Sequence, residues 1–166
     1  DHLELAARVK PPTRDMCKTL GDLHEALGLY SRAAEWLCRA YGAETAGPEK
    51  GGAIKITADD SYKVATLLEE GGRLEEAVAW YASIGEDDKA YAMAQSSLAY
   101  LFEEQGKLDE ALDAYARVRK VRPQDGRALL SAADIYLRKK KLDEALEAYA
   151  RAAALEDADQ KADGLA

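Results

Sequence analysis

One sequence pattern recurs along this chain at a fixed interval of 34 residues. It reads GGRLEEAVAWYASI at residues 71–84, QGKLDEALDAYARV at 105–118 and KKKLDEALEAYARA at 139–152. An earlier copy, LGLYSRAAEWLCRA at 27–40, lies 44 residues before the segment at 71–84. A constant period of this length indicates stacked copies of one small structural unit. The ten extra residues fall within residues 42–53, where glycine and proline favour a surface loop.

A second helical pattern precedes each copy, at residues 17–25, 61–69, 95–103 and 129–137. Its apolar residues lie three and four positions apart, as Val64 and Leu68 do, which is the spacing of one face of an α-helix. Glycine can end a helix with a positive φ angle at little cost. Between the two patterns glycine occurs in three units and lysine in the fourth, at Gly28, Gly72, Gly106 and Lys140. Each unit is therefore predicted to be a helical hairpin.

Small and large side chains occupy fixed positions of the repeat. The small ones fit where two helix axes, roughly 8–10 Å apart, leave no room for more. They are Gly21, Ala65, Ala99 and Ala133 in the first helices, and Ala33, Ala77, Ala111 and Ala145 in the second helices. The large ones are predicted to fill the space between neighbouring hairpins, and they are Leu37, Tyr81, Tyr115 and Tyr149. One hairpin cannot bury both of its faces, so each depends on its neighbours.

This combination of period, small columns, aromatic columns and turn glycines resembles the tetratricopeptide repeat (TPR) family. The resemblance implies an all-α fold, an α-solenoid of stacked antiparallel helical hairpins in a right-handed superhelix. The repeats would be residues 14–57, with the ten-residue insertion, then 58–91, 92–125 and 126–159. Four positions depart from the family pattern, because Ser61 and Gln95 replace large apolar residues, and Lys89 and Asp157 replace a closing proline.

The two ends also follow the repeat register. Residues 1–13 resemble the end of a preceding second helix, and residues 160–166 the start of a following helix or a tail. This predicts flanking repeats of the same protein as neighbours of the chain, with a capping helix and a disordered tail as the alternative. Between the first two repeats, residues 53–60 alternate like a short strand before Thr57 and Asp60 supply a plausible helix cap.

Composition and charge exclude several classes of partner. The chain is 48% hydrophobic and 33% charged, with a net charge of −8. An acidic chain lacks the clustered positive surface that releases counterions from nucleic acid, so no nucleic-acid partner is expected. No run approaches the roughly 20 apolar residues of a membrane span, and the N-terminal residues lack a signal pattern. No membrane insertion is expected, and a cytoplasmic location is predicted.

The residues that usually carry chemistry are scarce. Cys17 and Cys38 lie far apart without metal-ligand spacing, so both are predicted to be plain buried cysteines. His24 shares its column with Leu68 and is predicted to pack in the core. Neither histidine has a nucleophile or paired carboxylate at a catalytic spacing. The sequence therefore predicts no enzyme activity, no cofactor and no metal.

The resemblance implies a protein-interaction scaffold whose first helices line a concave groove for a partner protein or peptide. It also implies that the scaffold is part of a multi-subunit complex or a larger repeat protein. The positions that match the groove columns of the family are Lys18, Asp22, Tyr62, Lys63, Thr66, Met93, Ser96, Ser97, Tyr100, Arg127, Ser131 and Asp134. Tyr62 and Tyr100 are the predicted anchors. Some family members clamp a C-terminal carboxylate with a set of lysines, an arginine and asparagines. That set is missing from this sequence, and Asp22 would repel such a carboxylate.

Two alternatives remain beside the groove. One is a purely architectural segment that spaces a larger assembly and leaves the groove unused. The other is a basic ridge that would bind an acidic partner, or would simply be a solvated surface. Its residues are Arg117, Arg119, Lys120, Arg122, Arg127, Arg138, Lys139, Lys140 and Lys141.

Overall fold

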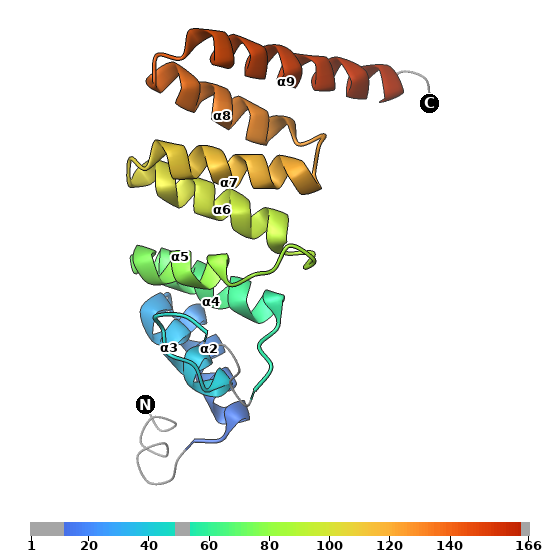
Figure 1. The fold of residues 1–166 in the computed structure, drawn as a ribbon. Coiled ribbons are helices and arrows are strands. Elements are labelled where there is room, and N and C mark those ends of the chain that lie inside the picture. The colour runs from blue at the N-terminus through green and yellow to red at the C-terminus, as the bar shows by residue number, and fades with distance from the viewer. Residues whose placement is uncertain (1–11, 49–53, 164–166) are drawn as a thin grey trace. The chain divides into compact units, whose positions relative to one another are not determined.

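The computed structural model describes residues 12–48 and 54–163, with side chains described up to residue 156. Within these ranges the chain forms eight α-helices joined by turns and loops (Figure 1). They are α2 (Arg14–Ala26), α3 (Tyr30–Tyr41), α4 (Ala58–Glu70), α5 (Leu74–Ala82), α6 (Tyr91–Glu104), α7 (Leu108–Val121), α8 (Gly126–Arg138) and α9 (Leu142–Asp163). The predicted all-α solenoid fold is confirmed. None of the described helices is long and apolar enough to cross a membrane.

The chain divides into two compact units, residues 1–90 and 91–166. The first contains the hairpins α2–α3 and α4–α5, and the second contains α6–α7 and α8–α9. Within each unit the helices of a hairpin pack on each other, and the second helix of the first hairpin also packs on the first helix of the next, as α3 does on α4 and α7 on α8. The predicted repeat boundaries stay predictions, although residues 160–163 continue α9 and begin no new helix. Residues 1–11 of the predicted preceding helix lie outside the described part.

All four hairpin turns have the same backbone geometry. In the α6–α7 turn, Gly106 has a φ angle of 72° and its N–H donates to the carbonyl of Glu103 at 2.9 Å. The N–H of Lys107 donates to the carbonyl of Phe102 at 2.8 Å, which completes a Schellman motif. The α8–α9 turn repeats these two bonds although Lys140 stands in the glycine position, with a φ angle of 59°. The break in the glycine column therefore changes the residue and not the turn.

Replacing Lys140 with glycine should raise the free energy of unfolding by about 1 kcal/mol, because a side chain in the left-handed region costs about that much. Urea unfolding followed by circular dichroism measures the change. The matched control is Gly106→Lys, which places lysine in the same turn one repeat earlier and should lower stability by a similar amount. Equal stabilities for Lys140→Gly and the parent chain would contradict a strained turn.

Side-chain caps start several of the first helices. The Thr57 hydroxyl accepts from the N–H of Asp60 at 3.1 Å, and a carboxylate oxygen of Asp60 accepts from the N–H of Thr57 at 3.3 Å, so α4 begins with the predicted cap as a full capping box. Asp125 caps α8 by accepting from the N–H of Ala128. The strand-like reading of residues 53–60 is wrong, because described residues 54–57 form no strand and α4 begins directly after them.

The predicted small column lies at the helix crossings. Gly21 of α2 is buried so closely against α3 that a Cβ atom there would lie 2.9 Å from Cδ2 of Leu37. Ala33, on the opposing helix, is completely buried. Cys17, Cys38 and His24 are buried in the same hairpin, as predicted, and Nδ1 of His24 hydrogen-bonds to the carbonyl of Leu20 at 2.7 Å.

The tyrosine column is partly as predicted. Tyr81 and Tyr115 are buried, and Tyr149 is half-buried. Each hydroxyl donates to a carboxylate on the first helix of its own hairpin: Tyr81 to Glu69 at 2.8 Å, Tyr115 to Glu103 at 2.8 Å, and Tyr149 to Asp134. Burial raises the pKa of Tyr115 to about 12, so the phenol stays a neutral donor. These side chains thus also tie together the two helices of one hairpin.

The inserted segment after α3 folds back onto the first unit. Its backbone bends at Glu44 and Gly47, which form an isolated bridge. The indole N–H of Trp80, on α5, donates to the carbonyl of Thr45 at 2.8 Å, and Nη2 of Arg73 donates to the Thr45 hydroxyl at 2.7 Å. Arg73 also pairs with Glu76 and Glu35. Residues of the predicted surface loop are therefore fixed by the second hairpin.

Candidate functional site

The twelve predicted groove residues all lie on first helices of the hairpins. Lys18 and Asp22 are on α2, and Tyr62, Lys63 and Thr66 are on α4, all in the first unit. The second unit carries the other seven, on α6 and α8, and they are Met93, Ser96, Ser97, Tyr100, Arg127, Ser131 and Asp134. Each unit therefore presents its own part of the predicted face, and the two parts differ in character.

In the first unit two charged groove residues, Lys63 and Asp22, form an ion pair with each other. The ammonium of Lys63 lies 2.9 Å from Oδ1 of Asp22 and 3.0 Å from Oε2 of Glu25, so it joins α4 to α2. The hydrogen bond to Asp22 raises the pKa of Lys63 above its usual value. The expected repulsion of a partner carboxylate by Asp22 is thus offset by a neighbouring cation.

Lys18 belongs to a second internal cluster of the first unit. Its ammonium lies 5.2 Å from the ring centroid of Tyr41, a cation–π distance, and the guanidinium of Arg14 lies 5.7 Å from the same ring. The Tyr41 hydroxyl donates to Asp60 at 2.6 Å, and burial, followed by this bond, raises the pKa of Tyr41. Lys18 is therefore held over the end of α3 by an aromatic partner.

Tyr62 and Thr66 pack against the buried tyrosine of their own hairpin. The rings of Tyr62 and Tyr81 meet edge to face with centroids 5.3 Å apart, and the Thr66 and Tyr81 hydroxyls are hydrogen-bonded at 3.1 Å. Tyr62 is half-buried. The aromatic anchor predicted here is thus engaged within the unit.

In the second unit two of the groove residues on α6, Met93 and Tyr100, are exposed, whereas Ser96 and Ser97 are half-buried. Met93 and Tyr100, seven positions apart and so on one side of the helix, are 47% and 53% exposed. Ser96, between them, returns its hydroxyl to the carbonyl of Ala92 in the same helix. This side of α6 therefore presents two large side chains with little competing polarity.

On α8 one polar groove residue is positioned by a tyrosine of the second helix, because Asp134 accepts from the Tyr149 hydroxyl. Ser131, on the same helix, is half-buried. Leu130, beside them, is 38% exposed. The sequence reading omitted Leu130, although it stands one period after Ser96 and two after Tyr62, so the repeat itself carried the signal.

An open pocket of about 600 Å³ adjoins the start of α8. The α7–α8 turn and the first turn of α8 form most of its wall, and Glu156 of α9 closes one side. Arg122, Arg127 and Leu130 line it together with Asp125 and Glu156, so the exposed apolar face of α8 ends beside two guanidinium and two carboxylate groups.

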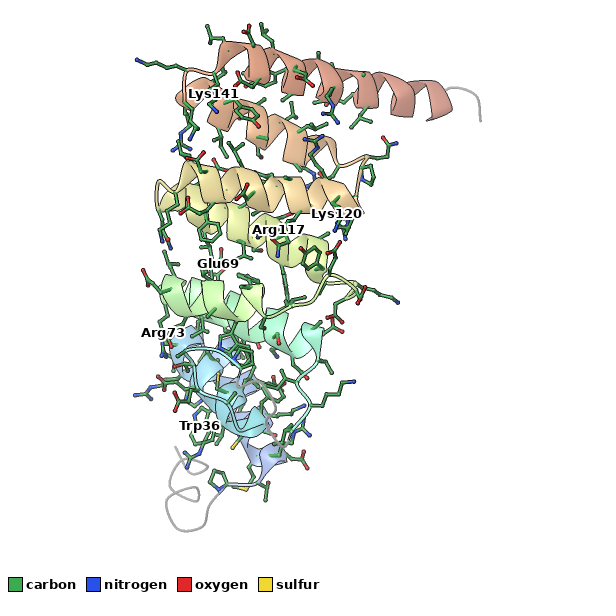
Figure 2. All side chains as sticks on the ribbon, in the orientation of Figure 1. Trp36, Glu69, Arg73, Arg117, Lys120 and Lys141 are labelled. Carbon is green, nitrogen blue, oxygen red and sulfur yellow. The ribbon has the colours of Figure 1, made fainter. Side chains whose placement is uncertain are left out.

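The predicted basic ridge is two separate groups. Arg117 and Lys120 lie near the end of α7, whereas Lys141 lies at the start of α9, beyond the opposite end of α8 (Figure 2). An α-helix of 13 residues spans about 20 Å, which separates the groups. Several of the cations have partners: Arg138 pairs with Glu103, Lys139 with Asp109 and Lys141 with Glu144. The basic residues therefore form two groups, which α8 separates.

The described residues hold no group of three or more histidine, cysteine or acidic side chains arranged to bind a metal. Burial raises the pKa of both cysteine thiols, that of Cys38 to about 12, which disfavours the nucleophilic thiolate. These features suit packing and binding more than covalent chemistry.

Comparisons with known proteins agree with this architecture. The tetratricopeptide repeat family model matches residues 97–163. No curated protein matches the sequence. The matched segment and the fold of the described residues are those of tetratricopeptide repeat proteins.

Solved structures of similar fold cover nearly the whole chain. A crystal structure of MamA aligns with a TM-score of 0.70 and 21% identity over 96% of this chain and 87% of MamA. YrrB, a TPR protein with an unusual peptide-binding site, aligns with a TM-score of 0.68 and 19% identity over 93% of this chain and 75% of YrrB. At identities this low, the alignments show that the fold is shared.

Proposed function

We propose that this chain is a protein-interaction scaffold whose second unit binds a peptide segment of a partner protein along α6 and α8. The observation that carries the proposal is the exposure of Met93 and Tyr100 on one side of α6, with Leu130 in the matching repeat register on α8. Exposed large apolar side chains that line up over neighbouring helices mark an interaction surface more specifically than scattered ones do.

The polar residues around this face suit an extended or helical peptide. Arg127 and Asp134 supply one charge of each sign, and Ser131 supplies a hydroxyl. A peptide with two apolar side chains and a nearby carboxylate would meet Met93, Tyr100 and the arginine-lined pocket at the start of α8. The peptide-binding site of YrrB, on a similar fold, supports this class of ligand.

The first unit is the weaker candidate because its groove residues already contact one another. Releasing Lys63 from Asp22 and Glu25, or Tyr62 from Tyr81, would offset part of the energy gained from a new partner. We therefore assign the main binding energy to the second unit, with Tyr100 as its anchor.

Replacing Tyr100 with alanine should weaken peptide binding by about 1–2 kcal/mol, a loss of roughly 5–30-fold in affinity. A phage-displayed library of random 12-residue peptides, selected against the intact chain, supplies the probe. Affinities of a selected peptide for the parent and variant chains can be measured by fluorescence anisotropy. Circular dichroism should show unchanged helicity, because Tyr100 is exposed.

The matched control is Tyr62→Ala, on the equivalent side of the first unit. It removes the edge-to-face contact with Tyr81, so it should lower stability while changing the affinity less than about twofold. Selected peptides that bind Tyr100→Ala and Met93→Ala as tightly as the parent would place the interaction elsewhere. If the parent chain selects no peptide at all, an architectural role without peptide binding is the better account.

A further inference from the structure

An arginine near the end of α7 is half-buried without a carboxylate partner. No carboxylate of the described residues lies within ion-pair distance of the Arg119 guanidinium. The residues one period before and after it are Gly85 and Ala153, so the repeat does not require an arginine at this position. Withdrawing a guanidinium from water without a paired anion costs free energy. Within the described residues, Arg119 is therefore a charge whose partner the fold does not supply.

A second guanidinium group lies within electrostatic range of Arg119. The pKa of Arg119 is below its usual value because burial disfavours the charged form, and the positive charge of Arg151 acts in the same direction. Arg151 is on α9, and α7 and α9 both pack on α8, which lies between them (Figure 1). The Arg151 side chain is 55% exposed and approaches Oε1 of Glu147 only to 4.0 Å, the outer limit of an ion pair. Two cations are thus brought together beside one loosely held carboxylate.

The hydroxyl of Tyr136, on α8, adds a third donor at the same place. Tyr136 is half-buried and also lies within electrostatic range of Arg119. Long side chains of a helix point toward its N-terminus, and α8 runs antiparallel to α7 and α9, so Tyr136 and the two arginines extend toward one another. The counterparts of Tyr136 are His24, Leu68 and Phe102, which carry no hydroxyl group. This donor is therefore specific to the last hairpin.

We propose that Arg119, Arg151 and Tyr136 form a binding site for a phosphoryl group carried by a serine or threonine side chain of a partner protein. Such a group presents three acceptor oxygens and a charge of about −1.5 to −2 at pH 7. A guanidinium can donate two parallel hydrogen bonds to these oxygens, and the phenol supplies one more. Three donor groups on three helices thus meet three acceptor oxygens.

Other anions fit these residues less well. A carboxylate has two oxygens and one charge, which would leave one of the two cations unpaired. A nucleic-acid backbone needs cations over an extended surface, whereas Glu147 and Glu156 stand on α9 beside this site and the chain has a net charge of −8. A single dianion therefore suits the site best.

The site is separate from the proposed peptide-binding face. It contains none of the exposed side chains Met93, Tyr100 and Leu130 on which that proposal rests. The two proposals can therefore fail independently of each other.

The test uses the full chain and a bead-bound peptide library in which one fixed phosphoserine is flanked by random residues. A selected phosphopeptide is compared with its serine and glutamate versions and with inorganic phosphate. The serine and glutamate versions should each bind at least about tenfold more weakly, because they lack the dianion. Inorganic phosphate should also bind at least about tenfold more weakly, because it lacks the flanking residues. Nuclear magnetic resonance should show that the phosphopeptide shifts the side-chain Nε–Hε signals of Arg119 and Arg151.

Single substitutions locate the site. Arg119→Gln and Arg151→Gln should each weaken phosphopeptide binding at least about tenfold, because each removes a charged donor from the phosphoryl oxygens. Tyr136→Phe removes only the hydroxyl and should weaken binding by roughly threefold to tenfold. The matched control is Arg117→Gln, two positions from Arg119 and so on another side of α7, where the guanidinium donates to Gln95. This control should bind the phosphopeptide like the parent.

Two further measurements separate a binding role from a structural one. Glu147→Gln removes the carboxylate that competes for Arg151, so it should raise the phosphopeptide affinity by roughly twofold to fivefold at low salt. Arg119→Gln should leave the Tm of the unliganded chain unchanged or raise it, because no ion pair of the described residues is lost. A clearly lower Tm for Arg119→Gln would show that this arginine serves the fold.

Four binding results would also overturn the proposal. If Arg119→Gln and Arg151→Gln both bind like the parent, the phosphopeptide is held elsewhere. If the glutamate peptide binds as tightly as the phosphopeptide, the site takes a carboxylate. If inorganic phosphate binds as tightly, the site takes the ion alone. If the library yields no binder that depends on phosphoserine, these residues do not receive a phosphorylated partner.

Discussion

Replacing Trp80 with alanine is expected to lower the free energy of unfolding by about 3–5 kcal/mol, the range for removing a large aromatic side chain from a core. Trp80 is completely buried, and its indole N–H holds the carbonyl of Thr45 in the inserted segment. Truncation would leave a cavity and an unpaired carbonyl together. Urea unfolding followed by circular dichroism measures the loss.

Two further variants separate the causes. Trp80→Phe keeps most of the buried volume but loses the hydrogen bond. Its loss of unfolding free energy should therefore exceed that caused by the smaller side chain alone by about 1–2 kcal/mol. Trp36→Ala is the matched control, because Trp36 stands in the same repeat column but is half-buried, with Arg39 stacked 5.5 Å from its ring. It should cost clearly less than Trp80→Ala. Equal losses at the two tryptophans would mean that the inserted segment is not fixed by Trp80.

The hairpins could be predicted from the sequence because the period of 34 residues constrains every unit at once. Glycine at Gly72 and Gly106 marked the turns, and the small residues marked the crossings. Lys140 shows that the turn follows from the repeat as a whole, since a lysine adopts the left-handed conformation where the surrounding helices require it. The tetratricopeptide fold could therefore be predicted from the sequence pattern.

Structural features that occur only once in the chain could not be predicted from the repeat pattern. The inserted segment has no counterpart in the other repeats, so nothing in the period indicated that Thr45 would meet Arg73 and Trp80. One signal was present: the column that holds Ala114 and Ala148 in the later repeats holds Trp36 and Trp80 in the two repeats beside the insertion. A buried tryptophan needs both extra space and an acceptor for its N–H, and a neighbouring insertion can supply both.

The candidate site was predicted as a face but not as a set of available side chains. Matching columns placed all the residues on first helices, yet ion pairs across hairpins, such as Lys63 with Asp22, depend on side-chain reach that a column does not encode. Tyr62 and Tyr100 both belong to the predicted groove face, although they stand in different repeat columns. They differ because Tyr62 lies beside the ring of Tyr81, whereas Tyr100 is 53% exposed.

Replacing Ala111 with leucine is expected to lower the free energy of unfolding by about 1–3 kcal/mol, because three added carbons must be accommodated in a close-packed crossing. Ala111 is completely buried on α7, and its counterpart Ala145 on α9 is equally buried. Thermal unfolding of the intact chain should show a lower Tm.

The matched control is Ala116→Leu on the same helix, where the side chain is exposed. Both variants make the same change in helix propensity, a few tenths of a kcal/mol at most, so a difference between them measures the crossing alone. If the two variants melt at the same temperature, Ala111 does not lie at a tight crossing. The small column, and with it the repeat register, would then have to be redrawn.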